Sequence, residues 1–160
     1  MRGLYLFIGG TLVGLAVQMA TAQNQNRDIV GVNHVGISVD NLDEAITYYT
    51  ETLGFPEAFR VVNDAGQIAL VYVQVSQNTF IELQPANPQR PPGINHFGVH
   101  VENMAAVTQM FKERGAEVTE IRLSSTNAVL SNVIDLNGIR MELAELPPES
   151  LHRQAMERWR

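Results

Sequence analysis

The strongest constraint on this chain is that one short pattern occurs in it twice. Residues 32–42 (VNHVGISVDNL) return as residues 94–104 (INHFGVHVENM), with every position matched at one constant offset. Each copy leads into an apolar stretch that ends at a glycine, and later into a triplet of apolar residue, Glu and Leu. Two such modules that pair about a pseudo-two-fold axis would bring a duplicated His and a duplicated Glu to one place. The repeat therefore predicts a fold of two equivalent halves with a shared site between them.

The N-terminal residues have the three parts of a secretory signal. Arg2 precedes the apolar run 4–17, and Ala20-Thr21-Ala22 follows it. We expect residues 1–22 to be removed, which predicts a periplasmic or secreted protein. The apolar run is shorter than the roughly 20 residues that a spanning helix needs, so no permanent membrane anchor is expected.

Composition narrows the partners and the available metal ligands. The chain contains no cysteine, which excludes disulfides and thiolate ligands, so any metal must be held by nitrogen and oxygen. Its net charge is −6 and its basic residues do not cluster, which argues against a nucleic-acid partner. We expect the partner to be a small-molecule substrate.

Hydrophobic periodicity predicts one α+β domain over residues 23–160. Module one covers residues 29–84 and module two residues 93–146, and each has the order βαβββ; residues 85–92, which contain four prolines, form the linker. A strand at 32–39 precedes a helix at 42–54, and short strands include 118–123. The two modules would form a curved eight-stranded open cup with helices outside. A last helix at 150–160 carries an apolar stripe of Leu151, Ala155 and Trp159, with His152 expected to face solvent.

The alternation of side chains along a strand places the duplicated residues on one face of the sheet. Side chains at i and i+2 point the same way, so His34 and His96 face away from the apolar positions of their strands, as do Glu82 and Glu142. Two His and two Glu suit an octahedral divalent ion such as Ni, Co, Zn, Mn or Fe, with positions left for substrate oxygens. Such a metal would stabilise charge on a substrate oxygen, and either Glu82 or Glu142 could act as the base.

A single strand histidine is more often a packed or surface residue than a ligand, and a single glutamate is usually an edge charge. Matched positions in two copies favour the metal interpretation. We expect four further residues to contact substrate: His100, Arg140, Tyr72 and Asn132. His100 lies about 13 Å along the strand from His96, beyond ligation distance, and could equally be a rim residue. Arg140 could hold an anionic substrate group or simply neutralise Glu142.

The repeated motif, Tyr48-Tyr49, Leu53-Gly54-Phe55 and the closing Arg140-Met141-Glu142-Leu143 resemble the vicinal oxygen chelate superfamily. That superfamily includes lactoylglutathione lyase, methylmalonyl-CoA epimerase, extradiol dioxygenases and the bleomycin and fosfomycin resistance proteins. The resemblance covers residues 29–146. Because members build the cup within one chain or between two, it is compatible with a homodimer.

The resemblance implies a ligand set and a ranking of activities. The lyase pattern of His, Glu, His and Glu falls on His34, Glu82, His96 and Glu142, whereas the epimerases tend to have Gln at the second place and extradiol enzymes use two His and one Glu. The Arg that binds glutathione in the lyases has no counterpart near Gly36. The first expectation is a glyoxalase-like, metal-dependent lyase or isomerase that acts through an enediolate. Alternatives are a sequestering protein of the bleomycin-resistance type and an extradiol-type dioxygenase.

Overall fold

The computed structural model describes residues 27–160, so the predicted signal, residues 1–22, lies outside the described residues. No helix in this part of the chain is both long and apolar enough to cross a membrane. The elements in order are β1 (Ile29–Val39), α2 (Leu42–Thr47), a π-helix η1 (Tyr48–Thr52), β2 (Glu57–Val62), β3 (Ile68–Ser76), β4 (Thr79–Pro85), β5 (Gly93–Val101), α3 (Met104–Glu113), β6 (Arg122–Leu123), β7 (Val129–Ile134), β8 (Arg140–Glu145) and α4 (Leu151–Arg158).

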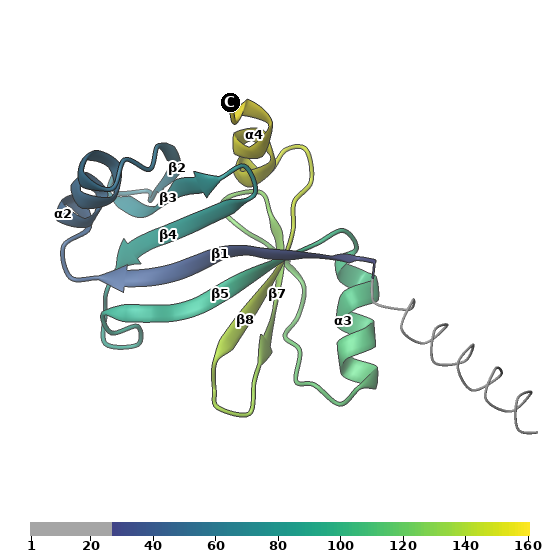
Figure 1. Cartoon of the computed structure of the whole chain (residues 1–160). Coiled ribbons are helices and arrows are strands. Elements are labelled where there is room, and N and C mark those ends of the chain that lie inside the picture. The colour runs from purple at the N-terminus through teal and green to yellow at the C-terminus, as the bar shows by residue number, and fades with distance from the viewer. Residues whose placement is uncertain (1–26) are drawn as a thin grey trace, which may run out of the picture.

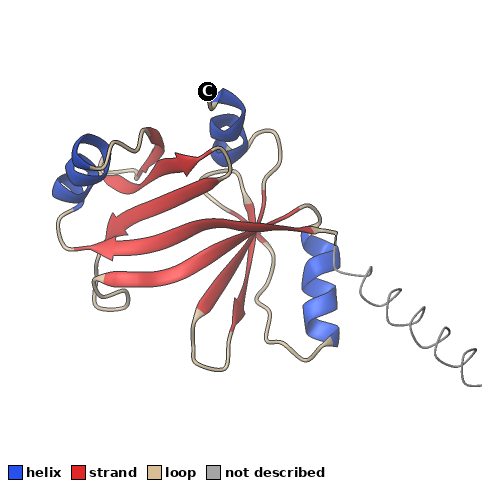
Figure 2. Cartoon of the chain, viewed as in Figure 1, coloured by secondary structure: helices blue, strands red, loops and turns tan. Residues whose placement is uncertain are grey.

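All eight strands form one sheet in the order β2-β3-β4-β1-β5-β8-β7-β6. β1 pairs in parallel with β4 and β5 in parallel with β8, while β1 and β5 run antiparallel at the centre. The two halves therefore have the same strand order on either side of the β1–β5 pair, and the sheet curves (Figure 2). This confirms the predicted α+β class, and one chain supplies the whole cup.

Asparagine caps begin helices α2 and α3. The side chain of Asn41 accepts the backbone N–H of Glu44, and Asn103 accepts that of Ala106. The helix predicted at 42–54 is divided: regular α-helix ends at Thr47 and continues as the π-helix, where Leu53 N–H donates to Tyr48 O at 3.0 Å. The wider turn is not visible in the spacing of the apolar residues.

The strand predicted at 118–123 is mostly absent. Only Arg122 and Leu123 form β6, and Val118 makes an isolated bridge. The reason is local: the Thr119 hydroxyl accepts the backbone N–H of Asn132 at 2.8 Å, so a side chain replaces a backbone partner in the ladder.

Two apolar clusters lie on opposite faces of the sheet. On the outer face of module two, α3 packs Met104 and Val107 against strand residues such as Val101 and Leu143. The second cluster lies on the concave face, which we define as the face that carries His34, Glu82, His96 and Glu142. It consists of Tyr72, Phe80, Ala128, Leu130, Ala144, Leu146, Ala155 and Met156.

The C-terminal helix α4 packs on the concave face near β2 and away from α3, which covers the outer face (Figure 1). The buried side chains of α4 are His152, Ala155 and Met156, at spacings of three and four residues. The predicted stripe shares only Ala155 with this set. Leu151 and Trp159 are half-buried.

Module one reverses the expected burial of its first strand. The apolar Val35 and Ile37 are only half-buried, whereas His34 and Ser38, on the other side of the strand, are each 1 % exposed. The short α2 has no buried residue, so it covers the outer face poorly. Much of the burial in this module lies on the concave face.

Candidate metal centre

Four side chains of the concave face converge at the centre of the sheet: His34 from β1, Glu82 from β4, His96 from β5 and Glu142 from β8. One ligand atom from each lies within 4.8 Å of the other three. The two imidazole Nε2 atoms are 3.0 Å apart, and each lies between 3.5 and 4.0 Å from a carboxylate oxygen of both glutamates. All four side chains are buried.

Register explains why two separate strands can bring their histidines together. Across the β1–β5 pair, His34 lies opposite Gly98 and Gly36 opposite His96. A Cβ at Gly36 would overlap the His96 ring, and a Cβ at Gly98 would overlap the His34 ring. The glycine two residues after each histidine is therefore the space into which the other histidine folds.

Tyr72 supports one carboxylate from the side of the site nearest α4. Its hydroxyl donates to Glu82 Oε2 at 2.5 Å. Burial, followed by the charges of Glu82 and Glu142, raises the pKa of Tyr72 well above its usual value, so the phenol remains a donor. Burial favours a protonated Glu82, but the hydrogen bond and charge of His96, the charge of His34 and the Tyr72 hydroxyl outweigh it and lower the pKa of Glu82 to about 2.

Arginines support the other carboxylate from the opposite, more exposed side. Arg140 Nη1 donates to Glu142 Oε2 at 3.2 Å, and Arg122 Nη2 lies 3.6 Å from the same oxygen. Burial tends to raise the pKa of Glu142, but the hydrogen bond and charge of His34 and the charge of His96 lower it overall. Both carboxylates are thus held ionised, as metal ligands must be.

The geometry and the chemistry of these residues fit a divalent metal. Bonds of about 2.1 Å place neighbouring octahedral ligands about 3.0 Å apart and opposite ones about 4.2 Å apart. The observed separations between ligand atoms, from 3.0 Å between the two Nε2 atoms to at most 4.8 Å, cover this range. Without an ion, two buried carboxylates this close would repel each other, which a cation relieves.

The four predicted substrate-contact residues differ in how near they lie to the four candidate metal ligands. Tyr72 and Arg140 touch the four-residue set directly, through Glu82 and Glu142. Asn132 Oδ1 accepts a hydrogen bond from Arg140 Nη1 at 3.3 Å, so Asn132 is linked to the four-residue set through Arg140. His100 is buried on the same face but outside the set, with Nε2 3.9 Å from a carboxylate oxygen of Glu102.

Two features of the site escaped the sequence analysis. His152 of α4 is 2 % exposed, which makes the prediction of a solvent-facing residue wrong; its ring centroid lies 6.1 Å from that of His34 and 4.5 Å from that of Tyr72. The spacing of His152, Ala155 and Met156 is the signal that could have found it. The asparagines that precede both histidines, Asn33 and Asn95, hydrogen-bond to them, and their duplication in the repeat was the available signal.

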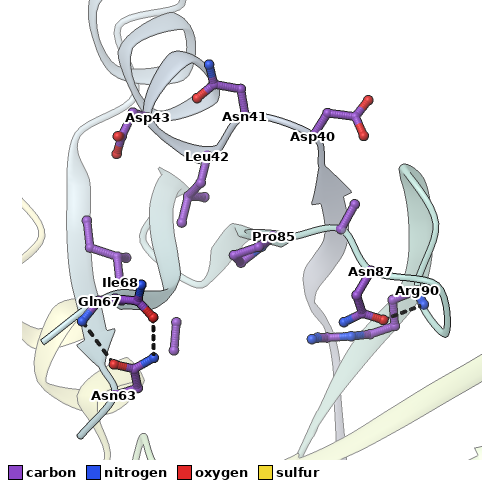
Figure 3. Close-up of a pocket in the computed structure, with 12 residues that line it drawn as sticks. Asp40, Asn41, Leu42, Asp43, Asn63, Gln67, Ile68, Pro85, Asn87 and Arg90 are labelled. Carbon is purple, nitrogen blue, oxygen red and sulfur yellow. Dashed lines mark hydrogen bonds between the residues drawn. The ribbon is translucent and has the colours of Figure 1, made fainter. Parts of the chain in front are cut away.

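Two pockets in the described residues differ in how near they lie to the site. One, about 890 Å³, lies at the rim of module one between the start of α2 and the linker, and none of the four metal-ligand candidates lines it (Figure 3). A smaller one, about 470 Å³, is lined by the linker, Asn95 and Arg140. Because Arg140 contacts both His96 and Glu142, this second pocket is adjacent to the site.

The fold is an eight-stranded cup of two like-ordered halves, and the two histidines and two glutamates that converge at its centre could hold a metal ion. The chain belongs to the Glyoxalase/Bleomycin resistance protein/Dioxygenase superfamily, whose family model matches residues 33–128. This confirms the resemblance drawn from the repeated motif. No curated protein sequence matches the chain.

Solved structures with the same fold include several methylmalonyl-CoA epimerases. That from Mycobacterium tuberculosis is 25 % identical, with a TM-score of 0.68 over 78 % of this chain and 93 % of its own. A second methylmalonyl-CoA epimerase is 21 % identical (TM-score 0.64; 77 % and 99 % covered). A hypothetical protein from Bacillus halodurans C-125 is 18 % identical (TM-score 0.63; 72 % and 94 % covered).

Proposed function

We propose that this protein is a divalent-metal-dependent lyase or isomerase that removes a proton next to a carbonyl group of a small oxygenated substrate. The observation that carries the proposal is the convergence of His34, Glu82, His96 and Glu142 within 4.8 Å. The ion, when bound, would act as a Lewis acid toward a substrate oxygen. The epimerases among the structural neighbours support an isomerase, because epimerisation also reverses a configuration next to a carbonyl.

The surroundings of the two glutamates assign them different tasks. Glu82 lies on the side closed by α4 and is fixed by Tyr72, which favours a permanent ligand. Glu142 lies beside Arg140 and Arg122, whose side chains are 30 % and 52 % exposed. We assign the proton transfer to Glu142: its carboxylate takes the C–H proton while the electron pair moves toward the carbonyl, and it then returns the proton to carbon.

The position of α4 favours a small substrate over a coenzyme A thioester. Ala155 and Met156 cover the half of the concave face that carries Phe80, Leu130 and Ala144. The remaining approach passes Asn95 and Arg140, where the adjacent pocket has two arginines, Arg90 and Arg140, and no carboxylate among its lining residues. An anionic substrate group would be held there.

Hydrogen–deuterium exchange tests this activity without knowledge of the product. The metal-loaded protein is incubated in D₂O with a panel of small 2-hydroxy ketones and 2-hydroxy aldehydes, with and without a carboxylate, and with acyl-coenzyme A thioesters. NMR follows loss of the proton next to the carbonyl. We expect exchange in at least one carboxylate-bearing small substrate, and none with Glu142→Gln.

Glu117→Gln is the matched control, because Glu117 is an exposed glutamate outside the site. Exchange that is equal in Glu142→Gln and the native protein would contradict the assignment of the base. Tight binding of a ligand by both proteins, without exchange, would instead favour the sequestering alternative. Exchange confined to thioesters would contradict the small-substrate proposal.

Export from the cytoplasm, which the N-terminal pattern predicts, is part of the same proposal. N-terminal sequencing of protein recovered from an expressing bacterium should begin at Gln23. A mature protein that retains Arg2 and remains in the cytoplasm would contradict it.

A further inference from the structure

Each candidate metal-binding histidine is preceded by an asparagine whose side chain lies against its ring. Asn33 Oδ1 lies 3.1 Å from His34 Nδ1, and Asn95 Oδ1 contacts His96 Nδ1 at hydrogen-bond distance. Neighbouring residues of a strand normally point to opposite faces, so this contact is unexpected. It requires a local change in the strand.

The change is a register shift at each asparagine. In the β1–β5 pairing, the register shifts between Val32 and His34, and again where Gly36 and Ile37 pair with His96 and Ile94. Asn33 and Asn95 are left out of the ladder, as in a β-bulge, and a further shift leaves out Val30. The bulge turns the amide toward the histidine that follows it.

Each amide is also fixed at its other end. Asn33 Nδ2 donates to Asn78 O at 3.0 Å, and Asn95 Nδ2 donates to Ser38 Oγ at 2.8 Å. With its NH₂ group so engaged, each asparagine presents its oxygen to the imidazole. An amide oxygen can only accept, so a hydrogen bond to it requires a proton on the Nδ1 atom that faces it.

We propose that Asn33 and Asn95 are positioning residues that keep a proton on Nδ1 of His34 and His96, so that Nε2 is the nitrogen that gives up any proton it holds and binds the metal; this inference rests on the proposed function. The Nε2 atoms are the ones that lie 3.0 Å apart at the centre of the site. Two neutral imidazoles that both carried a proton on Nε2 would direct two donors at each other. Outer hydrogen-bond partners of metal-bound histidines fix tautomer and ring orientation in this way.

The second module adds Arg140 to the arrangement. Arg140 Nη2 lies 3.3 Å from Asn95 Oδ1 and 2.7 Å from His96 Nδ1, and a guanidinium can only donate. In our assignment the protonated Nδ1 and the guanidinium both donate to Asn95 Oδ1, and the 2.7 Å between Nη2 and Nδ1 is a contact between two donors. In the alternative, Arg140 donates to a bare Nδ1 and His96 carries its proton on Nε2. No arginine contacts His34 in the described chain, where Phe80 pairs with it across β1 and β4.

Histidine tautomers and metal affinity test the inference together. Long-range ¹H–¹⁵N NMR of the metal-free protein should show protonated Nδ1 at His34 and His96. Asn33→Ala and Asn95→Ala should lower that population and weaken Zn²⁺ binding, measured by calorimetry, by 10- to 100-fold. Asn33→Asp and Asn95→Asp keep the accepting oxygen, so they should retain the tautomer and most of the affinity.

The aspartate variants separate the proposed role from a structural one, because they lose the same NH₂ donor as the alanine variants. Asn41→Ala is the matched control: Asn41 caps α2 in the same repeat, so its loss should lower the melting temperature and leave Zn²⁺ affinity unchanged. The inference would be overturned if the aspartate variants bound Zn²⁺ as weakly as the alanine variants. It would also be overturned if the alanine variants kept the native tautomers. A native protein that binds no Zn²⁺ would refute the proposed function, while the NMR comparison would still decide the tautomers.

Discussion

Gly36 lies directly beneath the imidazole ring of His96, and Gly98 stands in the same relation to His34. Neither glycine has the positive φ that would by itself demand this residue type. Each is needed because the other strand's histidine occupies the space of its missing side chain. The central strand pair can therefore bring the two Nε2 atoms to 3.0 Å from each other only if both positions lack a Cβ.

Gly36→Ala should disrupt the candidate metal centre and weaken the fold. The added methyl group must displace the His96 ring, and overpacking of this kind costs about 1–3 kcal/mol. We expect a lower free energy of unfolding in urea and a loss of metal at equilibrium, measured by elemental analysis. Val32→Ala on the same strand, at an exposed position, is the control. A Gly36→Ala protein with native metal content would show that metal binding does not require His96 in its observed position.

Removing the Tyr72 hydroxyl should shift metal binding to higher pH. Tyr72 donates to ionised Glu82, so Tyr72→Phe removes a group that lowers the pKa of that carboxyl. A raised pKa means that protons compete with the metal at higher pH, so binding is lost earlier on acidification. Metal retention between pH 5 and 2 should fall off earlier than in the native protein, whereas the exposed Tyr48→Phe should follow the native curve.

The buried His152 should make the metal-free protein sensitive to mild acid. Burial first, then the charge of His34, lowers the pKa of His152 to about 3, with Glu82 and His100 also acting on it and the Tyr72 ring packed against it. Because this pKa is below the unfolded value of about 6.5, the unfolded chain takes up the proton first, and stability falls as the pH drops from 6.5 toward 3. At pH 5 the loss is roughly 2 kcal/mol.

His152→Leu removes that titration and should flatten the pH dependence of the free energy of unfolding between pH 7 and 5. His100 also has a lowered pKa through burial, but it remains in both proteins, so the difference between them isolates His152. Parallel curves for the two proteins would contradict the buried, neutral state of His152.

A charge on the inner side of α4 should detach the helix from the concave face. Ala155 is 2 % exposed within the cluster that contains Tyr72 and Phe80, so Ala155→Asp buries an unpaired carboxylate. We expect a loss of about 3 kcal/mol in chemical unfolding and faster amide exchange in residues 151–158. Glu157→Asp, on the exposed side of the same helix, should change neither; native protection of Ala155→Asp would mean that α4 does not depend on this contact.

The sequence alone determined the paired modules, because the repeat duplicates both the strand alternation and the residues that carry chemistry. His34, His96, Glu82 and Glu142 could be placed on one face from the two-residue period of a strand. The β1–β5 register, the bulges at Asn33 and Asn95 and the position of α4 depend on contacts between residues far apart in the chain, which no local period encodes. His152 shows this most clearly: its helix has polar and apolar residues on several sides, and only packing against the concave face decided which side is buried.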